Sequence, residues 1–259
     1  MPSKLFKPNQ SVEKVLQIIE CLAQAGEPMR LNDLSKSVDM PDSTVLRIVN
    51  TLVQKGYAYQ EEHTHRYALT LRFSSIGQQV SNTLQIRDIV KPYLKQLSSL
   101  SGESACLAIE EEMEVIYIDV EDGVDGMLKI MQRIGKRAPL HATGVGKLFL
   151  TQYSPEKLQR LIQKKGLAAL TEHTLTTLDG LQKAIQTIKE QGYAMDDEEC
   201  ELGARCVAAP LYNYDNKVIA AISITGPSLR INSEKLEKLK KMILETSQAI
   251  SMQLGYNPA

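Results

Sequence analysis

Residues 43–55 read STVLRIVNTLVQK, and their pattern indicates how the N-terminal part of the chain folds. Apolar residues recur in it at three- and four-residue spacing, which predicts one buried stripe of a helix. The stripe consists of Val45, Ile48, Val49 and Leu52. The opposite face is polar and carries Ser43, Thr44, Arg47, Asn50 and Gln54. A helix with this division packs on one side and offers hydrogen-bonding groups on the other.

Two shorter patterns precede this helix. Residues 31–38, LNDLSKSV, predict a short helix, and residues 39–43, DMPDS, predict a tight turn in which Asp42 or Ser43 caps the next helix. Residues 11–25, SVEKVLQIIECLAQA, predict an amphipathic helix that Ser11 caps and Gly26 ends. Its expected apolar stripe is Val12, Val15, Leu16, Ile19 and Leu22.

The segment after Gly56 changes to an alternating pattern. Residues 57–70, YAYQEEHTHRYALT, predict a β-hairpin in which Tyr57 and Tyr59 face Tyr67 and Leu69 across a polar tip. A short helix, a turn, a longer helix with a polar face and a hairpin together form a winged helix-turn-helix. The alternative is a small α/β core whose polar face is merely solvated.

The polar face has the residue types that read duplex DNA. Arg47 can pair with guanine and Asn50 with adenine, while the hydroxyls of Ser43 and Thr44 can anchor phosphates. At the wing tip we expect contacts from His65 and Arg66, and His63 is either a further contact or plain surface. The formal net charge of −1 gives no global basic excess, so this prediction depends on the geometry of the motif.

The rest of the chain predicts a helical connection and a larger α+β domain. Residues 71–100 are helical in pattern, in two pieces, and Pro92 marks a first turn or a kink. The first piece either carries dimer contacts or packs on its own domain. Three β-rich stretches follow, at residues 103–111, 114–122 and 126–135, and then a loop at 139–146 and helices from 147, from 155 and over 178–191. Strands at 193–199, 205–213 and 218–226 and a final helix at 233–254 indicate a mostly antiparallel sheet.

Composition places the chain among ordinary globular proteins. Hydrophobic residues make up 43% and charged residues 24% of its 259 residues. The sequence contains no run long and apolar enough for a membrane span and no signal-peptide pattern at its start. Four cysteines are too few for a disulfide framework, so we expect reduced thiols and a cytoplasmic location.

Several blocks in this order resemble the isocitrate-lyase-regulator (IclR) family of bacterial transcription factors. The resemblance runs from about Gln10 to Tyr256 and is carried by SVEKVLQII (11–19), STVLRIVNTLVQKGY (43–57), RYALTLRFSSIG (66–77), RIGKRAPLHATGVGK (133–147), DDEECELGARCVAAP (196–210) and AAISITGPSLR (220–230). It implies a winged helix at residues 1–70, a linker helix at 71–84 and a GAF-like effector-binding and oligomerisation domain at 85–259. It also implies a homodimer or homotetramer that binds a palindromic operator, and small organic or aromatic acids as effectors.

The effector pocket is predicted partly from chemistry and partly from the resemblance. Gly144 and Gly146 in PLHATGVGK (139–147) let backbone approach a ligand, and the start of the following helix favours an anion at the amides of Gly144 and Val145. The resemblance places further residues in the same pocket, with an apolar wall from the first two: Met127, Ile130, Asp196, Cys206, Ser223 and Thr225. Taken alone, Cys206 could be a core residue, Asp196 part of a solvated acidic run, and Ser223 a residue that points outward.

Other chemical motifs fail on inspection. TGVGKL (143–148) lacks the first glycine and the hydroxyl residue of a phosphate-binding loop. A triad of His141, Asp196 and Ser223 has no nucleophile elbow around the serine. The residues Cys200, Cys206 and His141 lack the spacing and the fourth ligand of a structural zinc site, which leaves an adventitious or effector-linked metal as a minor alternative.

The predicted function is therefore control of a catabolic operon, most simply as a repressor, by a small organic acid, with no cofactor and no enzymatic activity. An activator of the same type is the alternative. Two other classes stay open from the residues alone: an enzyme of organic-acid metabolism that uses the same pocket, and an adaptor whose winged helix binds protein.

Overall fold

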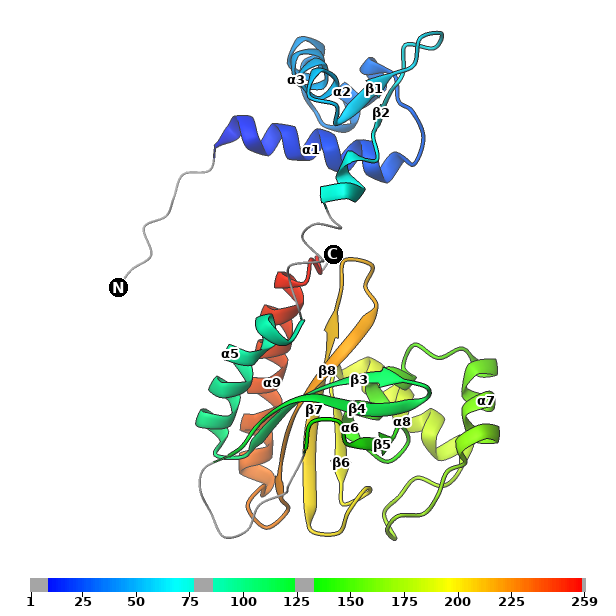
Figure 1. The fold of residues 1–259 in the computed structure, drawn as a ribbon, viewed down its shortest axis with the longest axis vertical. Helices are drawn as coiled ribbons and strands as arrows, with labels where there is room; N and C mark the ends of the chain where they lie inside the picture. The colour runs from blue at the N-terminus through cyan, green and yellow to red at the C-terminus, as the bar shows by residue number, and fades with distance from the viewer. Residues whose placement is uncertain (1–8, 77–85, 124–132, 258–259) are drawn as a thin grey trace. The chain divides into compact units, whose positions relative to one another are not determined.

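The computed structural model describes residues 9–76, 86–123 and 133–257. The chain divides into two compact units, residues 1–84 and 85–259, which are described separately (Figure 1). The second of the two helical pieces predicted within residues 71–100 is helix α5 (Ile86–Ser101), which lies wholly in the larger unit.

The smaller unit has three helices and a two-stranded hairpin. Its elements are α1 (Gln10–Ala25), α2 (Leu31–Ser37), α3 (Asp42–Gln54), β1 (Ala58–Gln60) and β2 (Tyr67–Leu69), and residues 72–76 are helical. The unit encloses one apolar cluster that all three helices and the hairpin share. The predicted order of elements is thus confirmed.

Three details of this unit differ from the predictions. Asn9, not Ser11, caps α1, because its side chain accepts hydrogen bonds from the amides of Ser11 and Val12. Pro41 occupies the N-cap position of α3, and no side chain caps that helix. Val12 and Leu16 are 54% and 51% exposed, since the face of α1 that packs inward centres on Ile18 and Leu22.

The register of the hairpin also differs from the prediction. Ala58 pairs with Leu69 and Gln60 with Tyr67, so Tyr59 lies opposite Ala68 and is 45% exposed. Ala58 and Tyr67 are the buried residues. In both arms, apolar residues occupy even and odd positions alike, so the alternation could not predict which face of the hairpin packs on the core.

The larger unit is a six-stranded antiparallel sheet in the order β5-β4-β3-β8-β7-β6, with helices on both faces (Figure 1). Its strands are β3 (Ser104–Glu111), β4 (Glu114–Glu121), β5 (Arg137–Pro139), β6 (Ala194–Asp197), β7 (Ala204–Tyr212) and β8 (Val218–Pro227). Its helices are α5 (Ile86–Ser101), α6 (Gly144–Leu150), α7 (Pro155–Lys165), α8 (Leu178–Gln191) and α9 (Ser233–Gln253). The predicted α+β class with an antiparallel sheet is confirmed.

Two apolar clusters hold the helices against the sheet. On one face, α5 and α9 cover a cluster that includes Leu94, Leu211 and Ile243. On the other face, α6, α7 and α8 cover a cluster that includes Leu148, Leu161 and Leu181. Because helices cover both faces of the sheet, β7 and β8 are almost entirely buried (Figure 1).

One prediction for the larger unit was narrowed and another was wrong in detail. Pro92 lies inside α5, which excludes the first turn and leaves a kink of the two predicted alternatives. The third β-rich stretch falls mostly in residues 124–132, outside the described residues, and its end at 133–135 is not a strand. Instead β5 begins at Arg137, and its three residues are too few for an alternating pattern to show.

The edge of β7 beyond the short strand β6 is closed by side chains. Strand β6 pairs only with Arg205–Ala208. Past that point, Ser247 of α9 donates to the carbonyl of Pro210, and the amide of Tyr212 donates to Ser251 Oγ at 3.0 Å. These hydroxyls satisfy backbone groups that a missing neighbour strand would leave unpaired.

One buried carboxylate anchors the start of the sheet. Glu103, whose side chain is 1% exposed, contacts Arg230 and Lys235 near the start of α9. The two cations hold the pKa of Glu103 below its ordinary value, although burial acts in the opposite direction. This cluster joins residues more than 120 positions apart in sequence.

Candidate functional site

The exposed face of α3 carries most of the residues predicted to read DNA. Ser43, Arg47 and Asn50 are exposed and Thr44 is half-buried. Residues 43, 47 and 50 are one helical face because they stand four and three positions apart. Leu46, 37% exposed, lies on the same side, and an apolar residue there suits a thymine methyl group. Periodicity alone assigned Leu46 no role.

The wing loop, residues 61–66, has a defined internal structure. The amide of Glu61 donates to the carbonyl of Arg66 at 2.9 Å, and His65 adopts a left-handed conformation with φ of 55°. His63 and His65 are exposed. Arg66 is half-buried, and its Nη1 donates to the carbonyl of Pro28 at 3.4 Å, so this guanidinium is partly committed within the unit.

The first turn after the hairpin is attached to the end of α3. Arg72 donates from Nη1 to the carbonyl of Lys55 at 2.9 Å, and its guanidinium lies 4.8 Å from the ring centre of Tyr57. The ring of Phe73 lies 5.2 Å from the same tyrosine ring. A displacement of residues 72–76 would therefore act directly on the C-terminal end of α3.

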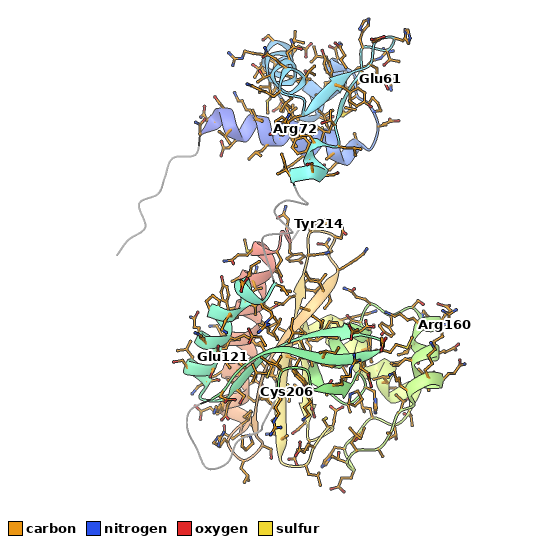
Figure 2. The ribbon with its side chains drawn as sticks, in the orientation of Figure 1. Glu61, Arg72, Glu121, Arg160, Cys206 and Tyr214 are labelled. Carbon is orange, nitrogen blue, oxygen red and sulfur yellow. The ribbon has the colours of Figure 1, made fainter. Side chains whose placement is uncertain are left out.

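The larger unit gathers the predicted pocket residues of three strands on one face of the sheet. Asp196 pairs with Cys206, and Cys206 pairs with Thr225. Ser223 stands two positions from Thr225, and directly paired or alternate residues point to the same side of a sheet. All four are at most 7% exposed. Figure 2 shows Cys206 inside the larger unit.

Helix α6 begins directly above this face. A Cβ built on Gly144 would lie 3.5 Å from Cys206 Sγ and 3.4 Å from Ala208 Cβ. Thr143 caps the helix and its hydroxyl accepts from the amide of Gly146 at 3.1 Å. Among the described residues, the amides of Gly144 and Val145 donate to no other group. Two free donors therefore point away from the helix at this end.

Asp196 closes a tight turn at the end of β6. Its Oδ1 accepts from the amides of Glu199 at 2.8 Å and Cys200 at 3.2 Å. The turn is also held from outside, because Thr171 donates to the carbonyl of Glu198 and Thr174 to that of Glu199, both at 2.6 Å. The side chain of Asp196 is therefore buried and hydrogen-bonded, and it is not part of a solvated acidic run.

A buried ion pair borders the site and was missed by the sequence analysis. Lys147 of α6, with a side chain 4% exposed, contacts Glu199, with a side chain 13% exposed. A lysine in the otherwise apolar helix GVGKLFL was the available signal, because a buried ammonium requires a carboxylate partner. Its partner lies 52 positions away, which the sequence could not indicate.

Tyr117 and Cys106 also belong to this site. Cys106 pairs with Ser223 across β3 and β8 and is fully buried. Burial, together with the neighbouring Cys206, Cys106 and Asp196, holds the pKa of Tyr117 well above its ordinary value. Ser223 Oγ is buried without a hydrogen-bond partner of normal geometry among the described residues.

The thiols of the site are uncharged near neutral pH. Burial and the nearby Asp196 raise the pKa of Cys206 to about 12. Burial and Cys206 likewise raise the pKa of Cys106 well above its ordinary range. A thiol in this state is a weak hydrogen-bond donor and not a nucleophile.

Three further findings complete the description. Met127 and Ile130, the predicted apolar wall, lie outside the described residues. Within residues 9–76, 86–123 and 133–257, no three His, Cys, Asp or Glu side chains are grouped as metal ligands. None of the helices in those ranges is long and apolar enough to cross a membrane.

The chain combines a winged helix, whose recognition helix has an exposed polar face, with an α+β domain that buries a polar cluster. This combination is typical of DNA-binding transcriptional regulators. Comparison with known proteins narrows the class. Residues 11–62 match the IclR helix-turn-helix domain, and residues 78–252 match the C-terminal domain of the bacterial transcriptional regulator IclR. The chain therefore belongs to the IclR family.

Individual relatives agree with this assignment. The chain is 32% identical over 247 residues to the HTH-type transcriptional regulator XynR of Escherichia coli, covering 95% of this chain and 98% of XynR. It is 33% identical over 258 residues to the regulator KdgR of the same organism, covering 98% and 97%. The fold resembles the repressor BlcR of Agobacterium tumefaciens, with a TM-score of 0.76 and 21% identity over 96% of this chain and 98% of BlcR.

Proposed function

We propose that this protein is a cytoplasmic repressor of a catabolic operon whose affinity for a palindromic operator is controlled by a small organic acid. The observation that carries the effector part is the pair of free amides at the start of α6, placed over the buried cluster of Asp196 and Cys206. The active species in this proposal is a homodimer or homotetramer, because a palindrome presents two half-sites.

In the DNA complex, α3 lies in the major groove. Arg47 pairs with guanine, Asn50 with adenine, and Ser43 and Thr44 hold phosphates. The wing adds contacts from His65 and Arg66. Arg66 contributes the guanidinium N–H groups that are not donated to the carbonyl of Pro28. The exposure of the helix face supports these roles.

In the effector complex, the amides of Gly144 and Val145 hold a carboxylate. Asp196, Cys206, Ser223 and Thr225 read the remaining polar atoms of the ligand from the sheet. Burial supports this arrangement, because the hydroxyl of Ser223 has only the weakly polar thiols of Cys106 and Cys206 beside it, and a ligand would give it a full hydrogen bond. Met127 and Ile130 are retained as the proposed apolar wall.

Control requires that the effector bind two arrangements of the oligomer with different affinity. We place the transmission in the linker, residues 71–84. Its first turn is attached to the end of α3 through Arg72, so a change in the linker alters the spacing of the two recognition helices. Operator affinity then changes because half-sites lie a fixed number of helical turns apart.

The experiment is footprinting on the DNA upstream of the chain's own gene, with and without a panel of metabolic acids. We expect a protected palindrome that one class of acid abolishes, and the Arg47→Ala variant should lose the protection. Arg160→Ala is the matched control, since it removes the same side chain from the exposed surface of α7 in the larger unit (Figure 2).

The results also decide between the alternatives. Protection that appears only with the acid would reverse the proposed effect of the acid on operator affinity, and transcription that rises with that protection in a reporter assay would make the protein an activator. Turnover of a bound acid that Cys206→Ala abolishes would favour an enzyme, although the neutral thiol of Cys206 makes nucleophilic catalysis unfavourable. Full DNA binding by Arg47→Ala, or no protected sequence under any condition, would contradict the proposed role of α3.

A further inference from the structure

The charges beside the proposed effector pocket do not balance. Lys147 is the cation that acts on Asp196, and two carboxylates, Glu199 and Asp196, lie near it, while Lys136 acts on the neighbouring Cys200. The ammonium is already engaged, because it contacts Glu199 Oε1 and both side chains are largely buried. An incoming organic anion would therefore meet a second carboxylate without a cation of its own.

The geometry of Asp196 shows which of its atoms is available. Oδ1 accepts two backbone amides, from Glu199 and Cys200. Oδ2 makes no hydrogen bond to any described residue, and the side chain lies on the same sheet face as Cys206 and Thr225. The residue as a whole is only 6% exposed, so burial favours the uncharged form of its side chain.

The groups that face Asp196 come from four elements. They are Lys147 of α6, Cys206 of β7, Tyr117 of β4, and Glu199 and Cys200 of the turn after β6. Burial, assisted by Glu199, raises the pKa of Asp196 to about 7, while the amides and Lys147 oppose this shift. The cysteines and the tyrosine stay protonated well above that pH. Burial also raises the pKa of Glu199, a shift that Lys147 opposes, and Asp196 is the group of this cluster whose pKa lies near neutrality.

We infer that Asp196 binds the effector as an uncharged carboxylic acid and donates a hydrogen bond from Oδ2, so that each effector anion enters the pocket together with one proton. This inference rests on the proposed effector site. A protonated Asp196 would determine specificity. Lys147 is already paired with Glu199, so the site can accept a ligand with one negative charge and disfavours a ligand with two. The physical reason is that two anionic carboxyl groups cannot share a dry site without a proton between them.

The test measures binding of acetate, glycolate and pyruvate to the full-length protein by calorimetry from pH 6 to 8.5, in two buffers of different ionisation enthalpy. We expect uptake of a proton approaching one per bound anion above pH 7. Affinity should fall about five- to tenfold per pH unit above pH 7, because only the protonated form binds.

The Asp196→Asn variant imitates the protonated acid. Its amide oxygen can accept from the same two backbone amides, and its NH₂ group can donate where Oδ2 stands. We expect it to bind the same anion with an affinity that varies less than twofold over this pH range. Asp197→Asn is the matched control, because Asp197 is exposed on the other side of the strand and pairs with Arg205 at 2.6 Å. It should keep the wild-type pH dependence.

A second variant keeps the test independent of Asp196 itself. Glu199→Gln removes the partner of Lys147, so the ammonium then acts on Asp196 and lowers its pKa. Carboxyl ¹³C NMR of the ligand-free protein should show a titration near pH 7 in the wild type and a lower one in Glu199→Gln.

The outcomes separate the two proposals. Binding of an anion without proton uptake, or loss of binding in folded Asp196→Asn, would overturn this inference and leave the effector site standing. If none of the three anions binds at any pH and the wider acid panel also fails, the effector site itself falls, and this inference with it.

Discussion

Adding one methyl group at Gly144 should weaken effector binding strongly without harming the fold. The new Cβ would lie 3.4–3.6 Å from Ala208 Cβ, Cys206 Sγ and the carbonyl oxygen of Ala194, which is ordinary van der Waals contact. It would fill the space between the start of α6 and Cys206, where the proposed carboxylate sits. Blocking one charge-assisted hydrogen bond removes about 1.5–3 kcal/mol, so effector affinity should fall roughly ten- to hundredfold.

Stability should respond in the opposite direction. Alanine favours a helix over glycine by at most about 1 kcal/mol, and the contacts at Gly144 add no clash, so the variant should unfold at equal or slightly higher denaturant. Gly146→Ala gives the contrast. Its Cβ would lie 2.5 Å from Leu140 Cα and from the hydroxyl of Thr143, which is the cap of α6. Because backbone must move, we expect a loss of about 2–4 kcal/mol.

The assay combines guanidinium unfolding followed by circular dichroism with fluorescence anisotropy on operator DNA, with and without the acid found by screening. Gly144→Ala should bind DNA as the wild type does and respond only at roughly ten- to hundredfold higher concentrations of the acid. A normal effector response in this variant would refute the placement of the carboxylate at α6. Equal stability of the two alanine variants would contradict the close approach of Leu140 and Thr143 to Gly146.

Three other changes test separate parts of the structure. Glu103→Gln should cost about 2–3 kcal/mol, less than a fully buried pair because its cationic partners reach solvent. Since the folded state lowers the pKa of Glu103 from 4.5, this stabilisation is complete at neutral pH and is lost progressively as the pH falls below 4.5 through the lower folded-state pKa, so wild type and variant should converge in acid unfolding. Ser251→Ala leaves the amide of Tyr212 without its acceptor and should lower the unfolding free energy by about 1–2 kcal/mol, with faster amide exchange at Tyr212 by NMR. Arg47→Ala should weaken specific operator binding by about 1–3 kcal/mol in anisotropy titrations while nonspecific binding changes little, and a uniform loss on all DNA would instead make Arg47 a phosphate contact.

The sequence alone was sufficient wherever local periodicity and end signals agreed. The helix predicted over residues 178–191 has those bounds in the structure, and Gly192 ends it in a left-handed conformation as a glycine C-cap does. The winged-helix order was likewise readable, because each of its helices has its own apolar stripe and its hairpin has its own alternation. The family blocks then indicated which strands carry the pocket residues.

Features that depend on pairing between distant segments could be read only from the folded chain. The hairpin register could not be read because tyrosines and alanines alternate at both parities, and only packing on the helices selects Ala58 and Tyr67 as the inward residues. Strand β5 was missed because three residues carry no period.

The candidate site shows the same division. Sequence placed Gly144, Asp196 and Cys206 on separate segments, and the fold brought them to one face of the sheet. The sequence could not show that Lys147 pairs with Glu199, because an ion pair between residues 52 positions apart leaves no local pattern. Local sequence determines backbone conformation because its interactions are between near neighbours, whereas partners, register and the charge balance of a buried site depend on which distant residues the folded chain places in contact.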